Sequence, residues 1–386
     1  MKKTLVAIAA VGAFSGSAQA QSSVTIYGVL DGNLLSLKTN VAGTGALAGT
    51  VQSPRQAKVD AAGLSGGRWG IRFVEDLGGG WSAVGRLESG IALDTGASLQ
   101  GGALFGRQAN VGVSSDSFGT VLIGRNTSAY GDVSADHAMM ETSIFDPSNI
   151  NNGNSATAAV ALITAATPAA RVTAALPFLT ARNTTWLGHA SRFSNSVKYN
   201  TPTFGGFSAA LLYGLGEDNT TTTSASRTIS IAGKYVNGPL LISGGYQSEG
   251  VARTATTSPK FENKLISVSY NFGVAKLGVG YNVAKYKDLT PGVSLDAQKE
   301  YNFSIAVPFG ATTVSAGYAR SKGNDFGTSS GIGIQVLYTL SKRTTLYAGA
   351  QNTKAYDKLV DSIRLVAPAS NVGNTTGYGV GIRHTF

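Results

Sequence analysis

The sequence predicts an all-β protein, a 16-stranded antiparallel transmembrane β-barrel, on three observations. Charged residues make up only 13% of the 386 residues, whereas soluble domains average about 25%. Apolar residues alternate with small or polar ones, and the body of the chain lacks the runs of about 20 apolar residues that membrane helices need. Short and long connections also alternate along the chain. Together these features argue against a soluble α/β enzyme, a coiled coil or a helical transporter.

Residues 1–20 indicate a cleaved signal peptide. Two lysines precede an apolar run, and Ala18-Gln19-Ala20 provides the small residues of a cleavage site. A single transmembrane barrel domain is therefore expected over 21–386, in an exported protein. Without the two N-terminal lysines, this domain has 29 cations and 21 acids, a formal net charge of +8. Because the chain has no cysteine, disulfides and thiolate metal sites are excluded.

Period-two alternation marks the strands. Tyr301, Phe303 and Ile305 alternate with Asn302 and Ser304, which places apolar side chains on one face and polar ones on the other. A soluble sandwich shows the same alternation in any one strand, so the number and length of the strands carry the argument. The predicted strands are 22–35, 68–76, 81–93, 104–114, 118–126, 192–201, 204–215, 227–237, 239–249, 263–272, 274–287, 299–308, 311–321, 330–340, 344–356 and 376–386. Segments of about ten residues cross a bilayer when tilted.

The connections between these strands divide into two kinds. Short turns such as 76–80 and 115–117 alternate with long connections, which span 36–67, 94–103, 127–191, 216–226, 250–262, 288–298, 322–329 and 357–375. Phenylalanines accompany glycine in the short turns, at positions 118, 204, 207, 272 and 309. With Phe386 they are expected to form an aromatic girdle at one rim. Ordinary hairpin chemistry with core phenylalanines is the alternative interpretation.

Arginines concentrate on the first half of the predicted barrel. The expected lumenal set is Arg68, Arg72, Arg86, Arg125 and Arg192. A charge on the lipid face near mid-membrane costs about 2–4 kcal/mol, so the lumen is the inexpensive location. Arg107 has the parity of Ala109 and Val111 and is left open. The alternative is that these arginines form rim salt bridges or contact lipopolysaccharide.

Acids mark the first part of the long connection 127–191. The expected acidic side of the constriction consists of Glu88, Asp132, Asp136, Glu141 and Asp146. If this connection folds inward, its carboxylates face the arginines across the lumen. Opposed charges in a narrow, poorly screened gap produce a transverse field.

Segments spread over the mature chain resemble the general diffusion porins of Gram-negative outer membranes, nearest the neisserial and Burkholderia-type branch. The matching segments begin at Ser23 (SVTIYG), Gly67 (GRWGIR), Glu75 (EDLGGG), Leu87 (LESG), Leu104 (LFGRQA), Phe118 (FGT) and Gly381 (GIRHTF). Arg68, Arg125 and Arg192 resemble the basic cluster of that family. The resemblance implies a homotrimer in the outer membrane, in contact with lipid and lipopolysaccharide, and a third loop folded into the lumen to make the constriction. It also implies that Phe386 is the signal for the barrel-assembly machinery.

At one point the sequence departs from this pattern. Where the family loop often carries a Pro-Glu-Phe-type segment at its tip, this chain has Asp146-Pro147-Ser148-Asn149. Which acid lies at the narrowest point is therefore left open. The resulting expectation is a passive, water-filled channel for small hydrophilic solutes and ions, with a weak anion preference.

No enzymatic constellation stands out. His137, His189 and His384 lack metal-ligand spacing, and the glycine-rich segment 377–381 has no following helix, as a nucleotide loop requires. We expect no cofactor, no metal and no nucleic-acid partner. The alternatives kept are a substrate-specific channel whose binding site is built by the long third loop and, less favoured, a barrel hydrolase or a plugged structural barrel.

Overall fold

The strands form a closed antiparallel barrel in the computed structural model, which describes residues 22–42, 51–140, 143–148, 185–221, 225–250, 256–358 and 373–386. Its strands are β1 (Ser23–Thr39), β4 (Arg55–Ala61), β5 (Arg68–Gly78), β6 (Trp81–Gly90), β7 (Gln108–Ser115), β8 (Gly119–Thr127), β9 (Arg192–Asn200), β10 (Phe207–Gly214), β11 (Thr228–Asn237), β12 (Leu240–Gly250), β13 (Lys260–Asn271), β14 (Lys276–Lys287), β15 (Gln298–Phe309), β16 (Thr312–Lys322), β17 (Thr328–Thr339), β18 (Thr344–Lys354) and β19 (Thr375–Thr385).

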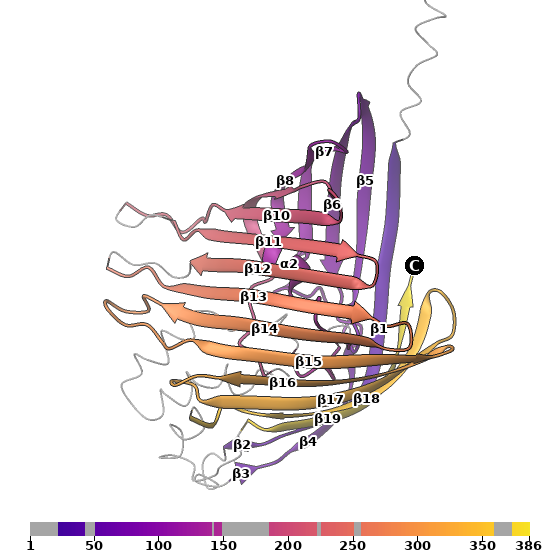
Figure 1. The fold of residues 1–386 in the computed structure, drawn as a ribbon, viewed down its shortest axis with the longest axis vertical. Coiled ribbons are helices and arrows are strands. Elements are labelled where there is room, and N and C mark those ends of the chain that lie inside the picture. The colour runs from indigo at the N-terminus through magenta and orange to yellow at the C-terminus, as the bar shows by residue number, and fades with distance from the viewer. Residues whose placement is uncertain are drawn as a thin grey trace, which may run out of the picture.

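Neighbours in the chain pair with each other, and β1 closes the ring by pairing with β19. In Figure 1, β10–β15 cross β5–β8 at a steep angle, because strands in a barrel tilt relative to its axis. The sheet has 17 labelled strands, but β4 and β5 pair with successive parts of the same edge of β1 and count as one strand of the barrel. The barrel therefore has the predicted 16 strands. No helix in the described part of the chain is long and apolar enough to cross a membrane.

The largest difference from the predicted strands is in 36–67, which was expected to be a long connection. Here β1 continues to Thr39, and β4 runs back along it. Beyond them, β2 (Val41–Ala42) and β3 (Val51–Gln52) make a small separate ladder. Between β4 and β5 the chain bulges out of the ladder, and the buried Asp31 carboxylate accepts hydrogen bonds from the backbone N–H groups of Gly63, Leu64 and Ser65. One acid thus satisfies the donors that the bulge removes from the ladder.

The two faces of the barrel differ as the alternation predicts. Cross-strand partners share a face, and the pairs Val24↔Phe73 and Ile71↔Leu87 place apolar side chains outward. Outward side chains such as Ile332 remain exposed, at 60%, although they are large and apolar. Apolar side chains without a protein partner fit a surface solvated by lipid.

The predicted aromatic girdle lies at the rim of short turns. Phe118, Phe204, Phe272 and Phe309 are 57–66% exposed there. The Trp81 ring stacks on Phe118, with centroids 5.7 Å apart. Phe386 is at the same rim, where its backbone exchanges hydrogen bonds with Gly28.

Candidate channel constriction

The described parts of the third loop lie against the inner face of the barrel. The loop begins with α2 (Ala129–Val133), which is capped by the Ser128 hydroxyl and lies against β11 and β12. Tyr130 is buried there. Its backbone N–H donates to Ser230 Oγ at 2.8 Å, and its hydroxyl donates to Asn282 Oδ1 at 3.1 Å. A loop held in this way fills part of the lumen, as the resemblance implied.

After α2, the loop continues along the same wall toward β17. The Met139 N–H donates to Ser304 Oγ at 2.9 Å, and the Ser143 hydroxyl donates to Gln335 Oε1 at 2.6 Å. Glycines on the inner face make room for the loop: a Cβ at Gly333 would lie 1.8 Å from the carbonyl oxygen of Phe145. The wall is thus shaped to receive this loop.

The histidines of the loop are structural. The His137 ring is buried and stacks on Trp186, with centroids 5.0 Å apart. Burial lowers the pKa of His137 from 6.5 to about 4, so the ring is neutral at physiological pH. His189 is buried and contacts the ring of Tyr130. Among the described residues, no group of three or more potential ligands could hold a metal ion.

Arginines project from the wall formed by β5 and β6. Arg72 is directly opposite Arg86 in the β5–β6 register, on the face away from Ile71 and Leu87. Arg68 has the same inward parity on β5. Within the described residues, no carboxylate lies within 4.0 Å of Arg72 or Arg86. All three side chains have the inner-face parity of their strands, and their place at the constriction stays a prediction.

Glu88 is the one acid of the predicted constriction that lies on this arginine wall. It is buried. Its carboxylate accepts hydrogen bonds from the Tyr27 hydroxyl at 2.7 Å and from Arg107 Nε at 2.6 Å. Arg68 Nε is 4.0 Å from the same carboxylate. Glu88 therefore holds cations in position and is itself compensated.

The structure answers the question of parity for Arg107. This residue precedes β7, so it does not follow the outward alternation of Ala109 and Val111, and its side chain turns inward to Glu88. Arg192, the first residue of β9, is within electrostatic range of Arg68, Arg107 and Glu88. Arg107 thus belongs to the inner group, whereas Arg192 lies close both to this group and to Arg125.

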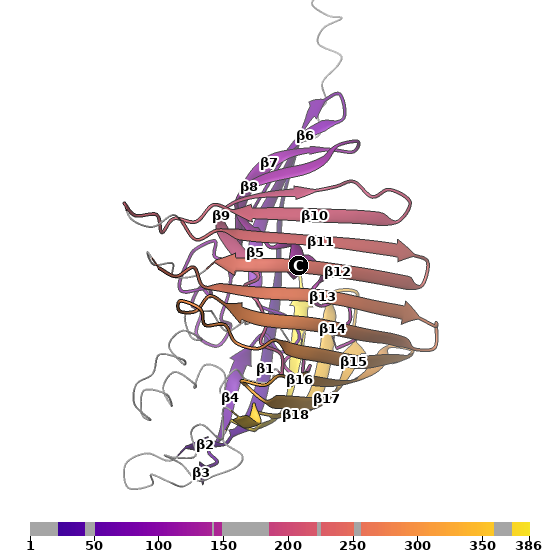
Figure 2. The ribbon, with the colours of Figure 1, turned by 60° about the vertical axis from the view of Figure 1, so that its left-hand side comes forward.

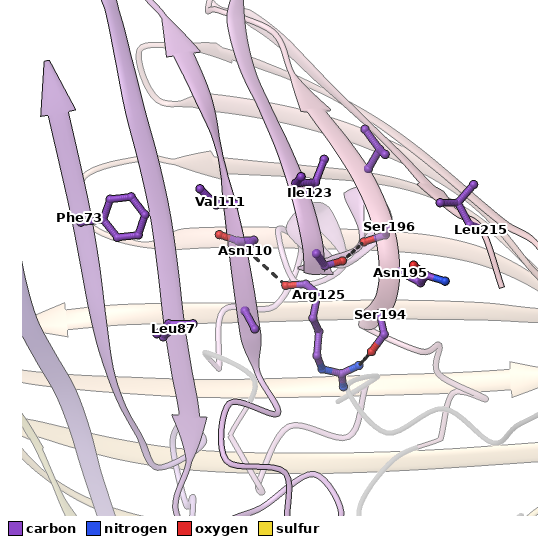
Figure 3. A pocket seen from close by; sticks show the side chains of 13 residues that line it. Phe73, Leu87, Asn110, Val111, Ile123, Arg125, Ser194, Asn195, Ser196 and Leu215 are labelled. Carbon is purple, nitrogen blue, oxygen red and sulfur yellow. Dashed lines mark hydrogen bonds between the residues drawn. The ribbon is translucent and has the colours of Figure 1, made fainter. Parts of the chain in front are cut away.

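Arg125 is a correction, because the structure does not place it in the lumen. In the β7–β8 register it is opposite Ala109 and shares a face with Ile123, which is the outer face. This orientation follows the regular alternation of β8, and the bulge between Gly124 and Asn126 affects only its pairing with β9. Figure 3 shows Arg125 reaching Ser194 beside the outward apolar side chains of Val111 and Ile123; they line an outer hollow of about 920 Å³.

Arg125 is held at this outer location by two hydrogen bonds. Its Nε donates to the Gly106 carbonyl at 2.7 Å, and a terminal nitrogen donates to Ser194 Oγ at 2.9 Å. Because protein groups near the long-loop rim satisfy its guanidinium, the free-energy cost of a charge in lipid does not force Arg125 into the lumen.

The acids of the loop do not form an open row facing the arginines, which is a second correction. Asp132 pairs with Lys198 at 2.5 Å, and Asp136 pairs with Lys234 at 3.0 Å. Burial raises the pKa of Asp132, and the neighbouring Lys198 opposes that rise. Both partners are lysines on the inner wall that the sequence analysis overlooked, since nothing local in the sequence links them to the loop.

Asp146 is fully buried rather than facing water. Its Oδ1 accepts hydrogen bonds from the backbone N–H and the hydroxyl of Ser148, and burial raises its pKa. It organises the turn at Asp146-Pro147-Ser148. Glu141 lies outside the described residues.

These pairings leave open cations on the arginine wall. The loop acids are neutralised by lysines or buried, whereas Arg72 and Arg86 remain open to the interior. Arg383, opposite Asp31 in the β1–β19 register, adds a further inward cation that sequence reasoning missed. Rings of arginine and lysine favour anions in a pore.

A closed barrel with a lipid-type outer face, an aromatic rim and a loop inside a charged lumen defines a transmembrane channel protein. Comparisons with known proteins agree. Residues 6–358 match the model of the Gram-negative porin family. This chain belongs to that family, and its location is the outer membrane.

Individual relatives support the assignment. The chain is 30% identical to outer membrane porin protein 32 of Delftia acidovorans over 403 residues, and 28% identical to an outer membrane porin protein of Bordetella pertussis over 435 residues, with 100% of both chains covered in each case. Among solved structures, an anion-selective porin from Comamonas acidovorans matches with a TM-score of 0.71 and 26% identity, covering 95% of this chain and 100% of that one.

Proposed function

We propose that this porin is a passive, water-filled channel for small hydrophilic solutes and ions, with a weak preference for anions. The observation that carries the proposal is the asymmetry of the lumen: Arg72 and Arg86 are open on one wall, while Asp132 and Asp136 are already paired with lysines. A low-dielectric pore focuses such a field, which raises the local concentration of anions. The anion selectivity named for the Comamonas structure supports the same sign.

The proposed constriction consists of the inner wall of β5 and β6 with Arg107 and Arg192, facing the third loop. Conductance in planar bilayers separates a general channel from a substrate-specific one. A general channel gives conductance that rises linearly with salt and is not blocked by sugars, phosphate or organic acids. Saturation or block by one solute would instead establish the substrate-specific channel.

The assembly expectations extend this proposal. A homotrimer would give conductance steps in groups of three, and single independent steps would contradict it. Phe386, placed at the short-turn rim with its ring 46% exposed, is positioned for the barrel-assembly machinery to read. Loss of outer-membrane insertion on Phe386 deletion, with correct export, tests that role. Residues 1–20 lie outside the described part of the chain; an intact mass beginning at Gln21 tests their cleavage.

A further inference from the structure

The segment between β4 and β5 contacts two parts of the proposed constriction at once. We name residues 62–67 the spacer segment. It is the part of the chain that leaves the ladder beside β1, and Figure 2 shows β4, which precedes it, lying along β1. The first half of the spacer segment contacts the tip of the third loop, and its second half contacts two arginines of the inner wall.

The tip of the third loop is docked on the first half of the spacer segment. The Ile144 N–H donates to the Gly63 carbonyl oxygen at 2.8 Å. Leu64 is fully buried in an apolar cluster with Met140 and Phe145 of the loop, and Ile144 packs against the same cluster. The loop tip is therefore held by this segment through both a backbone hydrogen bond and apolar contact.

The second half of the spacer segment lies against the arginine group. A terminal nitrogen of Arg68 donates to the Gly66 carbonyl oxygen at 3.0 Å. A Cβ at Gly66 would lie 3.1 Å from a terminal nitrogen of Arg107, so this guanidinium rests on the backbone there. Because Gly63 and Gly66 are only three residues apart, one short stretch of chain separates the loop tip from these arginines.

Asp31 of β1 holds the spacer segment in place. Its carboxylate is fully buried and accepts hydrogen bonds from the backbone N–H groups of Gly63, Leu64 and Ser65, at 3.1, 2.8 and 2.8 Å. The Tyr347 hydroxyl donates to the same carboxylate. Hydrogen bonds to an ionised acceptor are stronger than those between neutral groups, so the segment is tied firmly to β1.

The backbone at the start of the spacer segment is strained. Ala62 has a φ of 68°, in the left-handed region that a residue other than glycine rarely adopts. Its N–H donates to the backbone carbonyl of Asp31 at 3.0 Å. Such a conformation persists only where the surrounding contacts impose it. The path of the segment is thus dictated by Asp31 and not by local preference.

We propose that Asp31 is a positioning residue for the constriction, because it holds the spacer segment between the loop tip and the arginines. The proposal rests on the proposed channel function and extends it, since it identifies what fixes the width of the opening. Without these hydrogen bonds, the spacer segment no longer presents a fixed surface to the loop tip. The loop and the arginines then separate, and the gap between them becomes wider and better screened by salt.

The first experiment compares Asp31→Asn with Glu262→Gln, each in the full chain reconstituted in planar bilayers. Both variants change one acid to its amide, but Glu262 shares the outer face with Ile266 and pairs there with Lys287. Asp31→Asn replaces an acceptor oxygen by a donor, so the spacer segment keeps only some of its hydrogen bonds. We expect the single-channel conductance of Asp31→Asn to rise by about 1.5-fold, and that of Glu262→Gln to stay at the native value.

The sign of the selectivity change separates positioning from charge. Removal of a carboxylate would by itself raise the anion-to-cation permeability ratio. Separation of the loop from the arginines should instead lower that ratio, by up to about twofold, because salt screens the arginines more fully in a wider gap. Tyr347→Phe keeps the carboxylate and removes one of its hydrogen bonds. It should change the conductance and the ratio in the same directions by a smaller amount, and it decides the question if Asp31→Asn does not fold.

A cross-link between the spacer segment and the loop tip provides a rescue. The chain has no cysteine, and Leu64 and Ile144 lie in the same apolar cluster, so Leu64→Cys/Ile144→Cys allows a disulfide between the two segments. In the Asp31→Asn background, the oxidised protein should return to the native conductance because the loop tip is again attached to the spacer segment. Reduction of the same preparation should raise the conductance again, which a general loss of barrel stability would not produce.

Unchanged conductance in both Asp31→Asn and Tyr347→Phe, an equal rise in Glu262→Gln, or a higher anion-to-cation ratio would each overturn the inference. A conductance that stays raised after oxidation would also overturn it. The native channel, measured alongside, separates this result from the proposed function. A native channel that is anion-selective and unaffected by Asp31→Asn refutes only the positioning role, while absence of native conductance refutes the channel.

Discussion

The two walls of the lumen differ in whether their charged side chains have a partner of opposite charge. On the wall of β5 and β6, Arg72 and Arg86 face the interior with no carboxylate within 4.0 Å among the described residues. On the wall of β10–β17, which crosses in front of it in Figure 1, the third loop covers the surface and its acids are paired or buried. Charge is thus compensated where the loop is anchored and left uncompensated where solutes pass.

The largest effect is expected from Gly333→Val, which fills the space that the loop occupies. The new Cβ would lie 1.8 Å from the Phe145 carbonyl oxygen, so the loop must move, and the free energy of unfolding should fall by about 3 kcal/mol. Urea unfolding followed by circular dichroism measures this. The control is Gly233→Val on the outer face, where the nearest atom to a Cβ is 3.9 Å away; an equal loss there would contradict a tailored wall.

Acid should loosen the loop wall through His137. Its pKa falls from 6.5 to about 4 on folding because the ring is buried, so the unfolded chain binds more protons between these values. The free energy of unfolding is therefore unaffected by His137 above pH 6.5. It decreases as the pH falls, by about 2 kcal/mol at pH 5, because the folded protein keeps this ring neutral.

His137→Phe keeps an aromatic ring against Trp186 and removes the titration. The difference in unfolding free energy between pH 7 and pH 5 should therefore shrink by that amount in the variant. An unchanged pH profile would show that the buried imidazole does not control acid sensitivity.

A somewhat smaller loss is expected from Asn282→Leu. The Asn282 side chain accepts from Tyr130 and donates to Asn263 and Glu300, so leucine removes three buried hydrogen bonds at once. The free energy of unfolding should fall by about 1–2 kcal/mol. Asn352→Leu serves as the control, since Asn352 bonds to Thr376 on the outer face; a loss of the same size would argue that the buried network does not anchor the loop.

The smallest effect is expected from Lys198→Met, which releases Asp132 from its ion pair. The Asp132 side chain is 37% exposed, so its freed charge should lower the anion-to-cation permeability ratio by less than about twofold. Loss of Lys198 also raises the pKa of Asp132 further, so the change should be greatest at alkaline pH. The double variant Lys198→Met/Asp132→Asn should restore the permeability ratio. A ratio that stays low would show that the freed charge of Asp132 is not its cause.

The barrel could be predicted from the sequence because the alternation within each strand distinguishes its outer residues from its inner ones. The alternate residues Tyr301, Phe303 and Ile305 indicate an outer face, and this prediction needs no information from any distant residue. The continuation of β1 and the strand β4 were missed because 36–67 is polar and small, and its pairing depends on Asp31 holding the bulge that follows. The local sequence pattern does not predict the pairing of β4 with β1, because that pairing depends on hydrogen bonds between Asp31 and residues more than 30 positions away.

The site was less predictable for two physical reasons. Arg125 was assigned to the lumen from the cost of charge in lipid, but it has the outward parity of Ile123, and its guanidinium is satisfied there by the Gly106 carbonyl and by the Ser194 hydroxyl from a distant part of the chain. Asp132 and Asp136 were expected to face the arginines, but their partners Lys198 and Lys234 come from strands far along the chain. Ion pairing across such separations follows from the path of the loop alone.

In the proposed function, the open arginines of β5 and β6 give the channel its anion preference. The most direct test is the reversal potential in a potassium chloride gradient across a planar bilayer, measured for the native channel, Arg72→Glu and Arg125→Glu. We expect an anion-selective sign for the native channel, a shift toward cations for Arg72→Glu, and no shift for Arg125→Glu, because Arg125 is on the outer face. A cation-selective native channel, or equal shifts in the two variants, would contradict it.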